Sequence, residues 1–288
     1  MNGDMLDGPA AITAIEAVRH ACREHDGVDP LDEAATLRLR HHGLDGIGHW
    51  VDNRGFALRR GTELDLAVSP AHRGEGHGRA LGILATTAPG ALTAWSHGDH
   101  PAAGALAGRL GFTRERALWV MRRPTVVPLP EAGPVDGVRI RDFGDGDTDA
   151  VLAVNAAAFA DHPEQGALDV AGFAERRAEA WFDPAGLLLA VEDDGELLGF
   201  HWTKQHDAAT GEVYVVAVSP NAQGRGLGRL LTLAGLRHLT SRGVDEIHLY
   251  VESDNAAARR MYESLGFGHA LADTHVQYRR ADDPDIPA

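Results

Sequence analysis

Apolar residues along the chain follow two spacings, the 3.6-residue period of helices and the alternation of strands. In the first half the pattern predicts helices over residues 10–23, 31–41 and 101–110, with a further helix from about residue 78. It predicts strands over residues 47–51, 61–68, 91–96 and 112–122. The stretch 41–60 leaves little room for two clear strands before Gly61.

The second half repeats this order of elements with a stronger pattern. Strands are predicted over residues 138–141, 187–191, 196–204, 212–218 and 246–251, and helices over 149–159, 170–181, 227–242 and 255–265, with more strands near the end. Residues 123–137 hold four prolines and no amphipathic period, which is typical of an extended linker. We therefore expect domains at 1–122 and 138–288, joined by the linker 123–137.

Two motifs recur between the halves. The run from Arg73 to Gly78 matches the run from Gln223 to Gly228 at an offset of 150 residues, and a Leu-Gly-Phe string recurs at an offset of 155. Two separate matches at nearly equal offset indicate a duplication. Since each half alternates helices and strands, the fold class is α/β or α+β, with a mixed, mostly antiparallel sheet flanked by helices in each domain.

Composition narrows the functional classes. The net charge of −15 argues against a nucleic-acid binder, and no apolar run is long enough for a membrane helix. The single cysteine, Cys22, excludes an internal disulfide and a cysteine-cluster metal site, and we expect no metal. We expect a cytoplasmic monomer that acts on a small molecule. The chain has one lysine, Lys204, and 26 arginines.

A glycine-rich segment after an apolar strand gives the strongest chemical signal. Val216, Ala217 and Val218 end the strand, and a Gln-x-x-Gly-x-Gly loop then opens a helix. Glycines let successive N–H groups point into one concavity at a helix N-terminus, which suits a pyrophosphate. The loop and the first helical residues are Gln223, Gly224, Arg225, Gly226, Leu227, Gly228 and Arg229. A glycine-rich turn without a ligand is the alternative.

A second motif, Asn-x-x-Ala-x-x-x-Tyr-x-x-x-Gly-Phe, begins at Asn255. Together the two motifs resemble the GNAT acetyltransferase superfamily. The resemblance implies that acetyl-CoA is the co-substrate, bound by the glycine-rich loop, by the strand before it and by Asn255, Ala256, Ala257, Ala258, Arg259 and Arg260. It implies that Tyr262 protonates the departing thiolate and that Glu212 is the general base. With a period of two, Glu212 should share a face with Tyr214 and Val216.

The first half keeps the loop but not the phenol. Aligning the Leu-Gly-Phe strings places Ala107 at the position of Tyr262, His100 at that of Asn255 and Trp95 at that of Tyr250. We expect this domain to be non-catalytic. It would still bind acetyl-CoA through Leu66, Ala67, Val68, Gly74, Glu75, Gly76, His77, Gly78 and Arg79.

Longer strings resemble the tandem-GNAT mycothiol synthase family over nearly the whole chain. They include residues 158–166, the Phe-His-Trp-Thr-Lys run at 200–204 and residues 249–255. The resemblance implies acetylation of the cysteinyl amine of a cysteine–glucosamine–inositol pseudodisaccharide. The implied substrate-binding residues are Glu33, Glu164, Lys204, Glu212 and Tyr250. A tandem GNAT enzyme for another amine, and a non-catalytic acetyl-CoA sensor, remain as alternatives.

Overall fold

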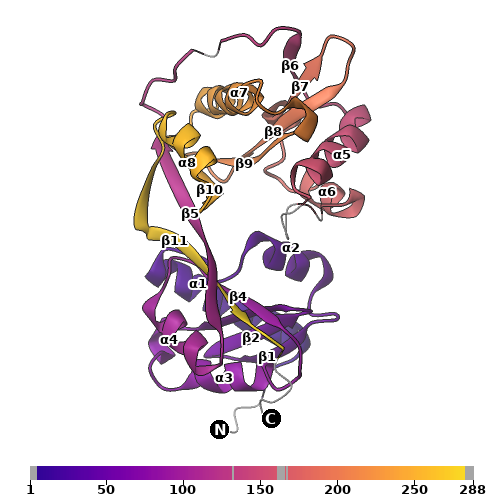
Figure 1. The fold of residues 1–288 in the computed structure, drawn as a ribbon. Coiled ribbons are helices and arrows are strands. Elements are labelled where there is room, and N and C mark those ends of the chain that lie inside the picture. Colours follow the sequence, from indigo (N-terminus) through magenta and orange to yellow (C-terminus); the bar gives the residue numbers. More distant parts are fainter. Residues whose placement is uncertain (1–4, 132, 161–165, 167, 283–288) are drawn as a thin grey trace. The chain divides into compact units, whose positions relative to one another are not determined.

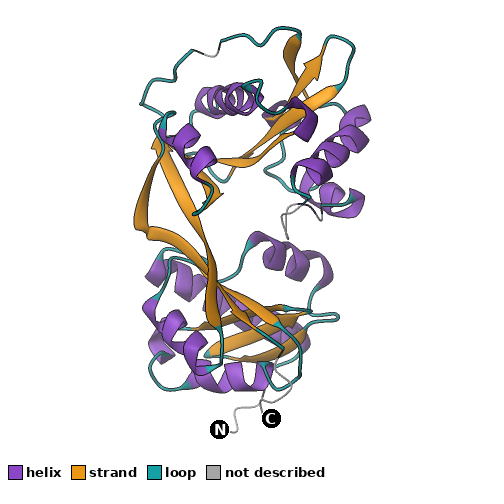
Figure 2. Cartoon of the chain, viewed as in Figure 1, coloured by secondary structure: helices purple, strands orange, loops and turns teal. Residues whose placement is uncertain are grey.

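The computed structural model describes residues 5–131, 133–160, 166 and 168–282, and the chain divides into two compact units (Figure 1). Unit 1 contains residues 1–119 and 270–288, whereas unit 2 contains residues 120–269. Helices and strands alternate in both, as Figure 2 shows by colour. The predicted mixed α/β class is confirmed.

Unit 1 is a sheet with helices on both faces. Its strands follow the order β1-β2-β3-β4-β11-β5. Its elements are α1 (Gly8–Asp26), α2 (Glu33–His42), β1 (Gly48–Asp52), β2 (Gly55–Arg60), β3 (Glu63–Val68), α3 (His77–Ala85), β4 (Leu92–Ser96), α4 (Pro101–Arg109), the first part of β5 (Thr113–Pro124) and most of β11 (Gly268–Arg280).

The segment before Gly61 holds two strands, so the expectation that it had little room for them was wrong. β1 and β2 form a tight antiparallel hairpin in which Asp52 pairs with Gly55. The Asp52 carboxylate accepts hydrogen bonds from the backbone N–H groups of Arg54 and Gly55, which closes the turn. Phe56 and Leu58 of β2 pack in the cluster that contains α1, because alternate residues of a strand face opposite sides.

Unit 2 has the sheet order β5-β10-β9-β8-β7-β6. Its elements are the end of β5, β6 (Val138–Asp142), α5 (Thr148–Ala158), α6 (Val170–Arg177), β7 (Leu187–Glu192), β8 (Leu197–Gln205), β9 (Thr210–Val218), α7 (Leu227–Ser241), β10 (Glu246–Glu252) and α8 (Ala256–Glu263). β9 pairs antiparallel with β8 and parallel with β10.

Helices cover opposite faces of the unit 2 sheet (Figure 1). On one face, His201 of β8 donates a hydrogen bond from its Nδ1 atom to the Leu231 carbonyl of α7 at 2.9 Å. Gly235 lets α7 approach this ring, since a Cβ atom there would lie 2.1 Å from His201 Cε1. On the other face, the fully buried Trp202 packs with Phe173 of α6. The Phe-His-Trp run therefore fills the core on both sides of β8.

Matching glycines show the duplication in three dimensions. Gly55 and Gly199 meet equivalent neighbours, because a Cβ atom would lie 2.6 Å from the carbonyl oxygen of Ala67 or of Ala217. In the loops, Gly74 and Gly224 have φ values of 79° and 78°, and Gly76 and Gly226 have 87° and 82°. The two halves thus share backbone geometry where their side chains differ.

Two segments lie elsewhere than the sequence suggested. Val276–Arg280 pair antiparallel with β4, so the last strand of the chain lies mainly in unit 1 rather than with the second half. Arg123 and Pro124 belong to β5 instead of an extended linker, and the fully buried Arg123 donates to the Leu265 carbonyl at 2.7 Å. Long-range pairing of this kind leaves no local pattern. Within the described ranges, no helix is long and apolar enough to span a membrane.

Candidate active site

Two parallel strands separate at the centre of unit 2. The registered pairs of β9 with β10 run from Thr210 with Glu246 to Val213 with Leu249. Both strands continue, β9 to Val218 and β10 to Glu252, with no further pair in the described register. The β10-facing backbone groups beyond Val213 are therefore placed to bind an extended ligand arm.

The glycine-rich loop follows at the end of β9. Gly224 and Gly226 both have positive φ, and Gly226 is the N-cap of α7 without a side-chain hydrogen bond. The first N–H groups of α7 thus have no capping side chain, and the helix dipole favours an anion beside them. The arginines of the loop and of the first turn of α7 are engaged elsewhere: Arg225 pairs with Glu192 at 2.8 Å and Arg229 donates to Ser264 at 2.9 Å.

Glu212 lies on β9 directly before the strands separate. It is 6% exposed and stands opposite Lys204 of β8 and His248 of β10. The β8–β9 register shifts between Trp202 and Thr203, which inserts a bulge at Tyr214. Because of that bulge, Val216 pairs with His201 on the α7 side, so the expected common face of Glu212 and Val216 was wrong.

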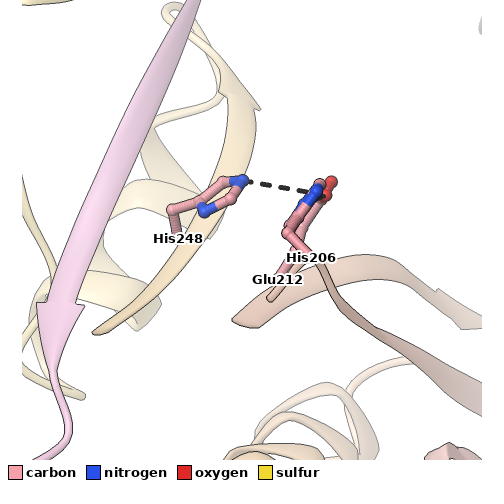
Figure 3. Close-up of side chains that lie close together, drawn as sticks. All are labelled: His206, Glu212 and His248. Carbon is pink, nitrogen blue, oxygen red and sulfur yellow. Dashed lines mark hydrogen bonds and ion pairs between the residues drawn. The ribbon is translucent and has the colours of Figure 1, made fainter. Parts of the chain in front are cut away.

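Two histidines that the sequence analysis did not select flank this carboxylate. His206 Nε2 lies 2.6 Å from Glu212 Oε2, and His248 Nε2 lies 3.7 Å from the same oxygen. Figure 3 shows the His248 ring directed toward the carboxylate, with the side chain of His206 beside Glu212. Burial disfavours the charged carboxylate, but the His206 hydrogen bond and nearby positive charge outweigh this effect and hold the pKa of Glu212 below its usual range.

The turn between β8 and β9 positions His206. Asp207 accepts hydrogen bonds from the N–H groups of Ala209 and Thr210, and His206 N–H donates to the Thr210 carbonyl. This tight turn returns the chain within a few residues and brings His206 beside Glu212. His248 had a signal in the sequence: it shares the period of two with Glu246 and Tyr250 in an apolar strand.

Lys204 lies against aromatic rings. Its Nζ atom is 4.8 Å from the Trp181 ring centroid and 5.2 Å from that of Tyr214. The Tyr214 hydroxyl accepts a hydrogen bond from Arg176 Nε at 2.8 Å. The positive charge of Lys204 is thus held on the side of the sheet that also carries Trp202.

Tyr262 lies on α8, which begins after β10. Its ring packs edge-on against Phe267 at 5.8 Å, and burial raises its pKa to about 12. The phenol therefore remains protonated at neutral pH and can donate a proton. Asn255 is the N-cap of α8 and accepts a hydrogen bond from the Ala258 N–H group.

The first unit has equivalent backbone positions with other side chains. His100 caps α4 as Asn255 caps α8, and the Ala107 carbonyl accepts from Phe112 N–H as that of Tyr262 accepts from Phe267. These contacts agree with the alignment of the halves. Near its loop, Arg73 donates to the Val68 carbonyl at 3.1 Å and also pairs with Asp26.

The structure brings together some of the residues that the sequence analysis predicts to bind the substrate. Lys204 and Glu212 are register partners, and the Tyr250 ring lies 5.7 Å from that of His248. Glu33 is the first residue of α2 in unit 1. Glu164 lies outside the described residues.

Comparisons with known proteins add the following. Residues 155–267 match the acetyltransferase (GNAT) family. A mycothiol acetyltransferase of a Nocardioides species is 54% identical over 96% of this chain and 100% of its own length. That of Salinispora tropica is 47% identical over 96% of this chain and 95% of its own.

Solved structures share the fold at lower identity. A GCN5-related N-acetyltransferase from Sphaerobacter thermophilus has a TM-score of 0.69 and 23% identity, covering 100% of this chain and 99% of its own. A tandem GNAT protein from the clavulanic acid biosynthesis pathway has a TM-score of 0.67 and 19% identity, with 97% of each chain covered.

Proposed function

The chain belongs to the mycothiol acetyltransferases within the GNAT family, and on this premise we propose that it acetylates the cysteinyl amine of a cysteine–glucosamine–inositol pseudodisaccharide to form mycothiol. Acetyl-CoA is the acetyl donor. Unit 2 performs the reaction in this proposal, and unit 1 is non-catalytic.

The separation of β9 from β10 is the main support. It leaves Val216–Val218 unpaired by β10 and places them directly before the Gly224–Gly226 turn and the uncapped start of α7. A pantetheine arm would add to the strand as β-strand addition does, and its pyrophosphate would reach the helix N-terminus. The buried carboxylate of Glu212 lies at the point of separation.

Glu212 and Tyr262 are proposed as the acid–base pair. Glu212 accepts a proton from the substrate ammonium, so that the amine nitrogen attacks the thioester carbonyl carbon. The tetrahedral intermediate then collapses with cleavage of the C–S bond, and Tyr262 gives its proton to the thiolate of CoA. The second proton that the nitrogen loses as it becomes an amide restores the Tyr262 phenol. The lowered pKa of Glu212 and the raised pKa of Tyr262 leave each group in the protonation state that this assignment needs at neutral pH.

Substrate contacts are proposed for Glu33, Glu164, Lys204 and Tyr250, in addition to Glu212. A hydroxyl-rich cationic ligand suits carboxylates and a phenol. We also propose a cytoplasmic monomer, a location that agrees with a single, buried, free cysteine.

Turnover of acetyl-CoA by the purified full-length chain tests the proposal. CoA release would be measured with the cysteinyl pseudodisaccharide and with its cysteine-free parent at equal concentration. Release only with the cysteinyl compound, together with an N-acetylated product by mass spectrometry, is expected. Equal turnover of an unrelated amine would assign the enzyme to another acceptor, and binding of acetyl-CoA without turnover of any amine would make the chain a sensor.

A further inference from the structure

Three potential metal ligands converge on one point in unit 2. One nitrogen each of His206 and His248 and one oxygen of Glu212 all lie within 4.8 Å of one another. They come from the β8–β9 turn, from β9 and from β10. Figure 3 shows the three side chains meeting from different segments of the chain.

The donor set suits Zn²⁺. Two imidazoles and one carboxylate form one of the known three-residue sets of zinc enzymes, with ligand distances of about 2.0–2.2 Å. Two ligands of one tetrahedral ion then lie roughly 3.4 Å apart by the same geometry. The His248–Glu212 separation of 3.7 Å is close to this value. The His206–Glu212 pair, at 2.6 Å, holds a proton that a metal ion would displace.

The His248 ring faces the cluster with one nitrogen. It is 7% exposed, and its Nε2 atom faces Glu212 Oε2 at 3.7 Å, beyond hydrogen-bond distance. This nitrogen is therefore directed at the point where the ion would bind, and no hydrogen bond to Glu212 has to be broken there.

The strands fix two of the ligands before any ion arrives. Glu212 and His248 are register partners in β9 and β10, so little conformational freedom is lost on binding. Lys204, the partner of Glu212 on the other side, places a positive charge nearby and opposes a cation. Removing that charge should therefore strengthen metal binding, whereas removing a ligand should weaken it.

We propose that His206, Glu212 and His248 form a Zn²⁺ site, and that the bound ion inhibits acetyl transfer because it takes the carboxylate that would accept the substrate proton. The inhibition rests on the proposed function of Glu212, whereas the metal binding does not. Three protein ligands leave a position open on the ion, as in zinc sites that exchange a water molecule.

The binding test uses the full-length protein and Zn²⁺ alone, because the thiols of the acceptor and of CoA bind zinc themselves. Competition with a chromophoric chelator would give the affinity and the stoichiometry. We expect one ion per chain, and at least about tenfold weaker binding by His248→Leu, since even the partners of metal ligands change affinity by this factor. Co²⁺ in place of Zn²⁺ should give the strong visible absorption of a four- or five-coordinate site.

Two matched variants sharpen the test. Glu192, Asp194 and Glu196 form a second acidic group that is largely exposed, so Glu196→Gln controls for binding there and should keep the wild-type affinity. Lys204→Met should bind Zn²⁺ more tightly. Circular dichroism and thermal unfolding check each variant, and His206→Ala replaces His248→Leu if the latter does not fold.

The outcomes separate the two ideas. Unchanged zinc affinity in folded His248→Leu or His206→Ala, or weaker binding by Lys204→Met, would overturn the site. Zinc bound at this site with undiminished turnover, at free Zn²⁺ set by a metal buffer, would overturn the inhibition. If no acetyl transfer occurs with or without zinc, the proposed function fails while the binding result stands.

Discussion

Acidification should destabilise unit 2 through one buried side chain, His201. Its ring is fully buried between β8 and α7, its Nδ1 atom bonds to the Leu231 carbonyl, and its Nε2 atom has no partner among the described residues. Burial lowers the pKa of His201 from 6.5 to about 4. The unfolded chain therefore takes up a proton on this ring at a higher pH than the folded chain does.

The sign and size of the change in stability follow from the difference between the pKa of His201 in the unfolded and in the folded chain. Above pH 6.5 the ring is neutral in both states, and stability is lost as the pH falls from 6.5 toward 4, where the folded ring also becomes protonated. Each pKa unit corresponds to about 1.36 kcal/mol, so the full loss is about 3 kcal/mol, and the loss between pH 7 and pH 5 is about 2 kcal/mol.

Urea unfolding of the wild type and of His201→Gln between pH 8 and pH 4 would measure the pH-dependent contribution of His201 to the free energy of unfolding. Other groups titrate in both proteins, so the difference between the two unfolding free energies isolates His201. A difference that stays constant across the range would refute the reasoning. If the variant does not fold, an NMR titration of the His201 ring decides, and a pKa near 6.5 in the folded wild type would refute it equally.

Other variants test the active site and the co-substrate loop. Tyr262→Phe and Glu212→Gln should each lower kcat by about 10²-fold, and the effect of Glu212→Gln should shrink at high pH, where the substrate amine is already neutral. A wild-type kcat in both variants would refute the proposed roles of the two residues as acid and base. Gly228→Val should fold, because no atom lies within 4 Å of a Cβ there, but its side chain should block the approach of the ligand to the backbone and weaken acetyl-CoA binding at least about tenfold. An unchanged affinity by calorimetry would argue against a role of this loop in acetyl-CoA binding. Cys22→Ala should keep kcat/KM, because burial raises the pKa of the thiol and the amine attacks directly; an acetylated Cys22 by mass spectrometry would contradict direct transfer. Glu33→Ala should raise KM for the pseudodisaccharide roughly tenfold to a hundredfold and leave acetyl-CoA affinity unchanged, and a KM equal to the wild type would remove it from the substrate set.

Local signals predicted much of the fold. The glycine-rich loop, the helix that follows it and the duplication were readable because glycine positions and apolar period are properties of short segments. The hairpin of β1 and β2 was missed because its turn depends on one carboxylate, Asp52, instead of a glycine-rich pair. The position of β11 was missed because pairing with β4 joins residues far apart in the sequence.

The site was predictable only in part for a related reason. Glu212 and Lys204 were selected through a family resemblance, but their registration across β8 and β9 depends on a bulge at Tyr214 that no local pattern indicates. His206 and His248 approach Glu212 only once three segments of chain are in place. Their convergence is a tertiary property, which a single sequence does not encode in any one motif.

The place of β11 has a consequence for the order of events during protein synthesis. β4 gains its partner on one side from residues 276–280, which leave the ribosome after the whole of unit 2. At a usual translation rate of about 5–20 residues per second, the 179 residues between Ser96 and Val276 delay that pairing by roughly 9–36 s. Unit 2, continuous in sequence, can complete its own core first, while the nascent N-terminal sheet waits with the edge of β4 open to chaperones or to wrong partners.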